Sequence, residues 1–201
     1  HPAQLQTVTF DAMGVTLAQK MNDGKFVASS LREDELFTFY RADGVRDTLS
    51  TGKAPYPFRF QGIDDTSLKV KKRIFEYRLK YNGHNDKFVV CYCLNNLFEI
   101  YNSDGSLHKR IIAPYPYLVD TNHLSADKLG VPIDELIFTF KDCCLTDDRI
   151  FLLYNGSSPT GMIGAQSKIY VFDYEGNPIK YYLLDRYAHS FCIDKQGGVI
   201  Y

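Results

Sequence analysis

One pattern of apolar and polar positions recurs along the chain. A continuous apolar run comes first, as in residues 87–92 and 150–154, and an alternating run that ends in Asp-Gly or Glu-Gly follows, as in residues 97–105 and 168–176. Continuous runs are typical of strands buried on both faces. An acidic residue followed by glycine marks a tight hairpin, because glycine adopts a positive φ without steric cost. With a further strand after each turn, the pattern predicts antiparallel meanders of three to four strands.

The pattern defines four repeat units, near residues 25–49, 87–112, 149–184 and 190–201. Successive turn glycines lie farther apart than the about 40–50 residues of a usual propeller blade, so each unit is expected to carry inserted loops. We interpret residues 1–201 as a single all-β domain of the β-propeller class. A closed ring needs about four to eight blades of four strands each. We therefore expect further blades outside these residues.

Composition narrows the classes of partner. The chain has 15 Tyr, 14 Phe and no Trp, and its formal net charge is −1. Mixed charges argue against a nucleic-acid partner, because such proteins concentrate basic residues on one face. The basic cluster at residues 69–73 is interpreted as the wet face of a strand. No apolar run reaches the about 18 residues of a membrane span.

The five cysteines do not form a disulfide or zinc pattern. Their number is odd and their spacing irregular, and the C-x-C and C-C pairs differ from zinc-ligand spacing. We interpret them as small buried hydrophobic residues. The pairs Asp64-Asp65 and Asp147-Asp148 are expected in water-facing turns, so no metal site is predicted.

Several segments resemble the TolB-like six-bladed β-propeller family of Bacteroides-type bacteria. Residues 52–58, GKAPYPF, are similar to that family's G-x-G-P-x-E-F loop but depart from it at Ala54 and Pro57. Residues 97–105 match its strand and turn, and the likeness is closest over residues 150–201. The resemblance implies six blades, export to the periplasm or cell surface, and in many members a lipid anchor, which would lie outside these residues. It implies no catalytic residues.

No catalytic motif is present, and no cofactor is predicted. The sequence lacks G-x-S-x-G, H-E-x-x-H, Walker A and EF-hand patterns. Candidate binding residues are instead the aromatic and histidine side chains near predicted loops or blade edges, where rings can stack on sugars or peptides. The alternative is that these rings pack inside the domain. The candidates are Tyr115, Tyr117, His123, Tyr154, Tyr187 and His189.

Three functions remain open. The first is a non-enzymatic, exported binding or scaffold domain, with its site at one mouth of the propeller and a glycan, peptide or protein as ligand. The second is a glycan- or peptide-directed hydrolase or lyase, since catalytic carboxylates need not form a sequence motif. The third is a structural protein–protein interaction module, which would expose a large apolar patch.

Overall fold

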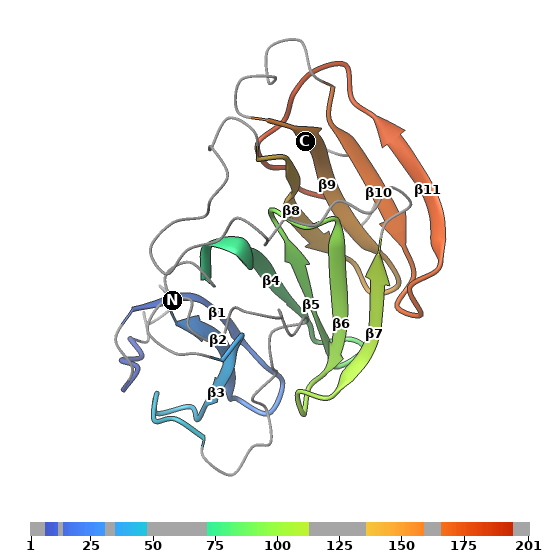
Figure 1. The fold of residues 1–201 in the computed structure, drawn as a ribbon. Helices are drawn as coiled ribbons and strands as arrows, with labels where there is room; N and C mark the ends of the chain where they lie inside the picture. The colour runs from blue at the N-terminus through green and yellow to red at the C-terminus, as the bar shows by residue number, and fades with distance from the viewer. Residues whose placement is uncertain are drawn as a thin grey trace, which may run out of the picture.

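Among the described residues the chain forms three antiparallel sheets (Figure 1). The computed structural model describes residues 7–11, 14–30, 35–47, 72–112, 136–158 and 166–194. The first sheet has the order β1-β2-β3, from β1 (Val15–Lys20), β2 (Phe26–Ser30) and β3 (Thr38–Tyr40).

The second and third sheets each have four strands in chain order. The second contains β4 (Tyr77–Asn82), β5 (Lys87–Tyr92), β6 (Leu97–Asn102) and β7 (Leu107–Ile112). The third contains β8 (Phe138–Leu145), β9 (Ile150–Ser157), β10 (Lys168–Phe172) and β11 (Pro178–Leu183). Such four-stranded meanders are the blades of a propeller, which confirms the predicted fold class.

The predicted hairpin turns form at their expected positions. Gly44, Gly105 and Gly176 have φ values of 85°, 86° and 79°. In each turn the carboxylate of an aspartate before the glycine accepts a hydrogen bond from a backbone N–H two residues further on. The Asp104 carboxylate, for example, accepts the backbone N–H of Ser106 at 2.8 Å. The pair of an acidic residue and glycine therefore identified these turns correctly, for the reason given from sequence.

Three details differ from the sequence expectation. The second and third sheets begin one strand earlier than the repeat units, at β4 and β8. Strand β6 is buried on both faces up to residue 101, although its sequence alternates. Residues 72–74 form a helical segment rather than a strand, and the Lys72 ammonium donates to the Glu35 carbonyl at 2.6 Å.

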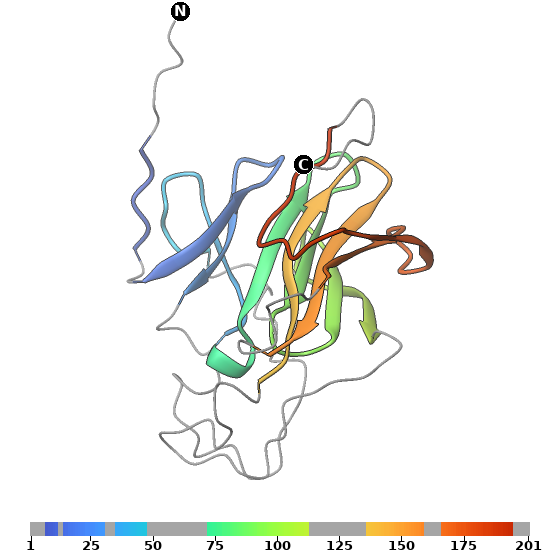
Figure 2. The ribbon, with the colours of Figure 1, turned by 90° about the horizontal axis from the view of Figure 1, so that it is seen from above.

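The sheets pack face to face in chain order (Figure 2). Their first strands lie nearest one another, since β1 contacts β4, and β4 contacts β8. One apolar cluster joins the first and second sheets, a second joins the second and third, and a third covers the far face of the third sheet. No helix among the described residues is long and apolar enough to cross a membrane.

The cysteines follow the sequence interpretation in part. Cys91, Cys93 and Cys143 are buried, whereas Cys144 is half-buried and Cys192 is exposed. Cys91 and Cys143 both belong to the cluster between the second and third sheets.

Candidate functional site

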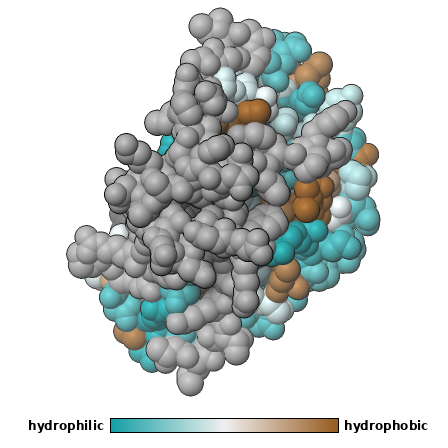
Figure 3. Space-filling model, in the orientation of Figure 1, coloured by the Kyte–Doolittle hydropathy of each residue, from teal (hydrophilic) through white to brown (hydrophobic). Residues whose placement is uncertain are grey.

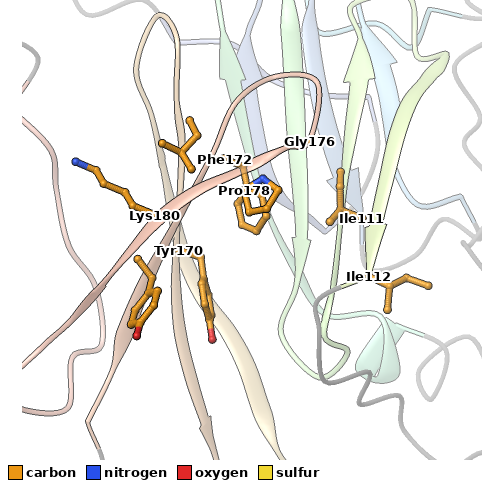
Figure 4. A pocket seen from close by; sticks show the side chains of 9 residues that line it. Ile111, Ile112, Tyr170, Phe172, Gly176, Pro178 and Lys180 are labelled. Atoms are coloured by element: carbon orange, nitrogen blue, oxygen red, sulfur yellow. The ribbon is translucent and has the colours of Figure 1, made fainter.

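A groove opens at the outer rim, between strand β7 of the second sheet and strands β10 and β11 of the third (Figure 4). Its volume is about 330 Å³. Both walls are mainly apolar, and they come from segments some 60 residues apart in the chain. The lining residues are Ile111, Ile112, Tyr170, Phe172, Gly176, Pro178, Ile179, Lys180 and Tyr181.

Strand register places the aromatic residues of the groove on one face. Tyr170 pairs with Tyr181 across β10 and β11, and their ring centroids are 6.2 Å apart. Phe172, two residues from Tyr170, points to the same face because side chains alternate along a strand. Phe172 also contacts Phe98 of β6, with ring centroids 4.7 Å apart. The floor of the groove is thus continuous with the core between the two sheets.

A glycine allows β7 to approach the third sheet closely. Gly176 has a φ of 79°, and a Cβ atom at this position would lie only 2.8 Å from Cγ1 of Ile111. The same turn is held to β7 by His108, whose Nε2 lies 3.3 Å from a carboxylate oxygen of Glu175. The width of the groove at this end is therefore fixed by the absence of a side chain at residue 176.

Exposed apolar side chains gather around the groove. Ile112 is 50% exposed, and Ile179, Tyr181 and Leu183 of β11 are 43%, 63% and 56% exposed. Figure 3 shows apolar patches between hydrophilic areas on the side of the molecule that carries β7, β10 and β11. Apolar surface of this kind beside a cavity is typical of a binding site.

Apart from the groove, a cluster of polar side chains lies inside the second sheet, around the fully buried carboxylate of Glu99. It accepts hydrogen bonds from the hydroxyls of Tyr92 at 2.6 Å and Tyr101 at 2.8 Å, and from Nε of Arg110 at 2.7 Å. Burial, together with the Glu99 charge, raises the pKa values of both tyrosines well above their usual range. These groups satisfy one another across β5, β6 and β7, as in a structural network.

The binding residues predicted from sequence lie in different surroundings in the structure. Tyr154 is half-buried and packs against Phe140 and Tyr170, with ring centroids 5.7 and 5.4 Å away. Burial raises its pKa. Tyr154 thus borders the core next to the groove, as the alternative interpretation of these rings expected. Its role in binding stays a prediction.

Tyr187 and His189 lie together. Their rings are 4.8 Å apart in an edge-to-face arrangement, in the segment that follows β11. Asn155, on the opposite face of β9 from Tyr154, donates its amide to the Ala188 carbonyl at 3.3 Å and so ties this segment to the sheet. Burial raises the pKa of Tyr187. Tyr115, Tyr117 and His123 lie outside the described residues.

A family comparison agrees with this architecture of meandering four-stranded sheets. The family described as TolB-like 6-blade propeller-like matches residues 3–196. The chain belongs to this TolB-like propeller family. Among the curated proteins, none matches it.

Solved structures show only distant similarity to this TolB-like chain. A eukaryotic initiation factor has a TM-score of 0.48 and 11% identity, over 88% of this chain and 34% of that one. A Bacteroides fragilis protein named as a candidate 6-phosphogluconolactonase has a TM-score of 0.49 and 14% identity, over 92% of this chain and 46% of that one. A Bacteroides vulgatus member of the duf4221 family has a TM-score of 0.46 and 7% identity, over 92% of this chain and 72% of that one. The chain thus spans about a third and about half the length of the first two.

Sequence reasoning missed the groove residues of this TolB-like propeller. Ile112 and Tyr181 belong to strands that the repeat predicted, but nothing local marks them as neighbours of one cavity. A usable signal was present in β11, where Ile179, Tyr181 and Leu183 alternate in the strand expected at the solvent edge of a blade. Apolar residues at such positions lack a core to pack against, which is a reason to suspect a binding surface.

Proposed function

We propose that this TolB-like propeller is a non-enzymatic binding or scaffold domain, exported to the periplasm or cell surface, that holds its partner at the rim groove between β7 and β11. The observation that carries the proposal is the groove itself, whose two apolar walls come from neighbouring blades. The proposal differs from the sequence-based expectation, which places the site at a mouth of the propeller.

The construction of the groove supports a preformed site. Phe172 anchors one wall in the core between the sheets, and Ile111 anchors the other against Gly176. A site built on packed strands loses little conformational entropy when it binds, so more of the contact free energy contributes to affinity. Among the lining residues Lys180 is the only charged one, and strand register places its side chain on the opposite face of β11 from Tyr181, so apolar contact would dominate recognition.

Thermal unfolding with a ligand panel tests the proposal. The full chain is melted alone and with glycans, peptides and divalent cations. A ligand that binds only the folded state adds about 2.7 kcal/mol of stability at a hundredfold excess over Kd. Tyr181→Asp should abolish the shift, because it places a charge on the groove wall. Leu107→Asp is the matched control, since Leu107 is 46% exposed on β7 but does not line the groove.

Two results would contradict the proposal. One is a melt that no ligand class shifts. The other is a shift that survives Tyr181→Asp as well as it survives Leu107→Asp. The exported location is checked separately by cell fractionation with an antibody against the chain, where recovery in the cytoplasmic fraction would refute it.

A further inference from the structure

Strand β11 is the outer edge of the third sheet, and its backbone is open to pairing. In the sheet order β11-β10-β9-β8, no strand among the described residues lies on the outer side of β11. An edge strand presents unpaired N–H and C=O groups, which can pair with another extended chain. An extended peptide can use these groups, whereas a small apolar molecule cannot.

Comparison with β7 shows that β11 is the less protected edge. Strand β7 is the corresponding outer edge of the second sheet and carries two charged residues, Lys109 and the Arg110 that pairs with Glu99. Charged residues on an edge strand oppose pairing with other chains. Strand β11 has a single charged residue, Lys180, among exposed apolar ones, and its one proline, Pro178, stands at the first residue, so the later residues keep their N–H groups.

The two faces of β11 differ in chemistry. Tyr181 lies opposite Tyr170 and faces the groove, and Leu183, two residues on, shares that face. Lys180 lies opposite Val171 on the other face, and its ammonium is 4.7 Å from the ring centroid of Tyr182. Within the described part of the chain Lys180 forms no ion pair. A strand added beside β11 would meet apolar residues on one face and a positive charge on the other.

We propose that β11 binds an extended peptide with alternating apolar and acidic residues as a fifth strand of the third sheet. This inference rests on the proposed function and names the partner of the same groove. The apolar side chains of the peptide continue the wall formed by Tyr181 and Leu183. Its acidic side chains lie beside Lys180, where opposite charges on neighbouring strands stabilise pairing.

A second copy of this chain fits the same edge less well. A two-fold pairing of β11 with itself would place two copies of Lys180 on one face of a shared sheet. Like charges on neighbouring strands destabilise such pairing. The charge of β11 therefore favours an acidic partner over self-association.

Fluorescence anisotropy with three synthetic peptides tests the proposal on the full chain. The first peptide alternates valine and glutamate, and the second replaces each glutamate by lysine. The third keeps the first sequence but carries N-methyl groups on alternate amides, which removes backbone donors along one edge. We expect the first to bind at least tenfold more tightly than either of the others.

Variants assign the binding to β11. Lys180→Glu should reverse the preference so that the lysine peptide binds more tightly, and Lys80→Glu, an exposed lysine on β4, should leave the preference unchanged. Tyr181→Asp should weaken the binding of the first peptide at least tenfold, and Leu107→Asp should leave it unchanged. Circular dichroism of each variant confirms that it is folded.

The proposal is overturned if the valine–glutamate peptide does not bind, if the three peptides bind alike, or if Lys180→Glu leaves the preference unchanged. It is also overturned if the chain is a dimer in sedimentation and Tyr181→Asp makes it a monomer, because the occupant is then a second copy. If no peptide binds but a non-peptide ligand gives a melting shift that Tyr181→Asp abolishes, the groove is a binding site and only its peptide partner is wrong.

Discussion

The side-chain amide of Asn85 donates a hydrogen bond of 3.0 Å to the carbonyl of Asp147, and this contact joins the first hairpin of the second sheet to the first hairpin of the third. The same relationship occurs one sheet earlier, where the Asn22 amide donates to the Gly83 carbonyl at 2.6 Å. The repeat therefore includes contacts between blades as well as the strands within each blade.

Removing one of these contacts should weaken the packing of neighbouring blades. Asn85→Ala removes this contact and also the oxygen that accepts the Asn82 side-chain amide at 2.8 Å. It is therefore expected to lower the free energy of unfolding by about 2 kcal/mol, the usual net value of two hydrogen bonds. Urea unfolding measures the change. Gln19→Ala is the matched control, because among the described residues the side-chain amide of the half-buried Gln19 bonds, at the surface, to the adjacent Ala18 carbonyl of its own strand. Equal effects of the two substitutions would show that the contact between blades adds nothing.

The Glu99 network predicts a larger loss. Glu99→Ala leaves two buried tyrosine hydroxyls and the Arg110 guanidinium without their shared acceptor. Removing one partner of a buried ion pair costs about 3–5 kcal/mol. The Arg110 side chain is 35% exposed, so water can solvate it, and we expect a loss near the lower end, about 3 kcal/mol.

Glu99→Gln separates charge from hydrogen bonding. It keeps an acceptor for the tyrosines but removes the charge, so it should cost less than Glu99→Ala. Glu175→Ala is the control, because Glu175 pairs with His108 at the surface and such pairs contribute little. Chemical denaturation measures all three. A loss from Glu99→Ala no larger than that from Glu175→Ala would refute the structural role of the network.

Local signals predicted much of the fold. Continuous apolar runs became β5 and β9, and the acid–glycine pairs became turns, because both depend on neighbouring residues only. The first strands of the second and third sheets were missed for a physical reason. Arg78 and Lys80 interrupt the apolar pattern of β4, and Lys141 and Asp142 interrupt that of β8. These are the first strands of their blades and contact the first strands of the neighbouring blades, so their partial burial depends on residues far away in the chain.

The candidate site was not predictable in the same way. The groove exists because Ile111 of one blade lies against Gly176 of the next, and no local pattern encodes that contact. Glu99 gives a similar lesson. Nothing in its alternating run indicates a buried carboxylate. The carboxylate is buried in the fold because Arg110, directly opposite it in the sheet, forms an ion pair with it.

Gly176 and Gly24 provide a matched test of the close approach at the groove. Both have a positive φ, of 79° and 84°, but a Cβ at Gly24 meets nothing within 4 Å. Gly24→Ala should therefore cost about 1 kcal/mol for backbone strain alone. Gly176→Ala adds a clash with Ile111 and should cost about 2 kcal/mol or more.

The double variant Gly176→Ala with Ile111→Ala isolates the clash. Removing the Ile111 side chain makes room for the new methyl group, so the combined loss should be smaller than the sum of the two single losses. Differential scanning calorimetry measures the four proteins. Strict additivity would show that Ile111 does not restrict residue 176.

Stability should fall at alkaline pH because of Cys93. Burial raises the pKa of this thiol to about 12, from an ordinary value of 9.0. The folded chain therefore keeps the Cys93 proton between about pH 9 and pH 12, whereas the unfolded chain releases it. Unfolding is favoured as pH rises through this window. At pH 10.5 the retained proton lowers the free energy of unfolding by about 2 kcal/mol.

Urea unfolding at pH 8 and pH 10.5 tests this expectation. Desolvation raises the pKa of Tyr81 to about 12 as well, so some alkaline loss remains in every variant. The decisive quantity is the change in the free energy of unfolding between pH 8 and pH 10.5. Cys93→Ala should lower stability at pH 8 through lost packing, but its further loss at pH 10.5 should be about 2 kcal/mol smaller than that of the unsubstituted chain. Cys192→Ala, at an exposed cysteine, should leave the alkaline loss unchanged, and equal losses in all three proteins would show that Cys93 does not retain its proton in the fold.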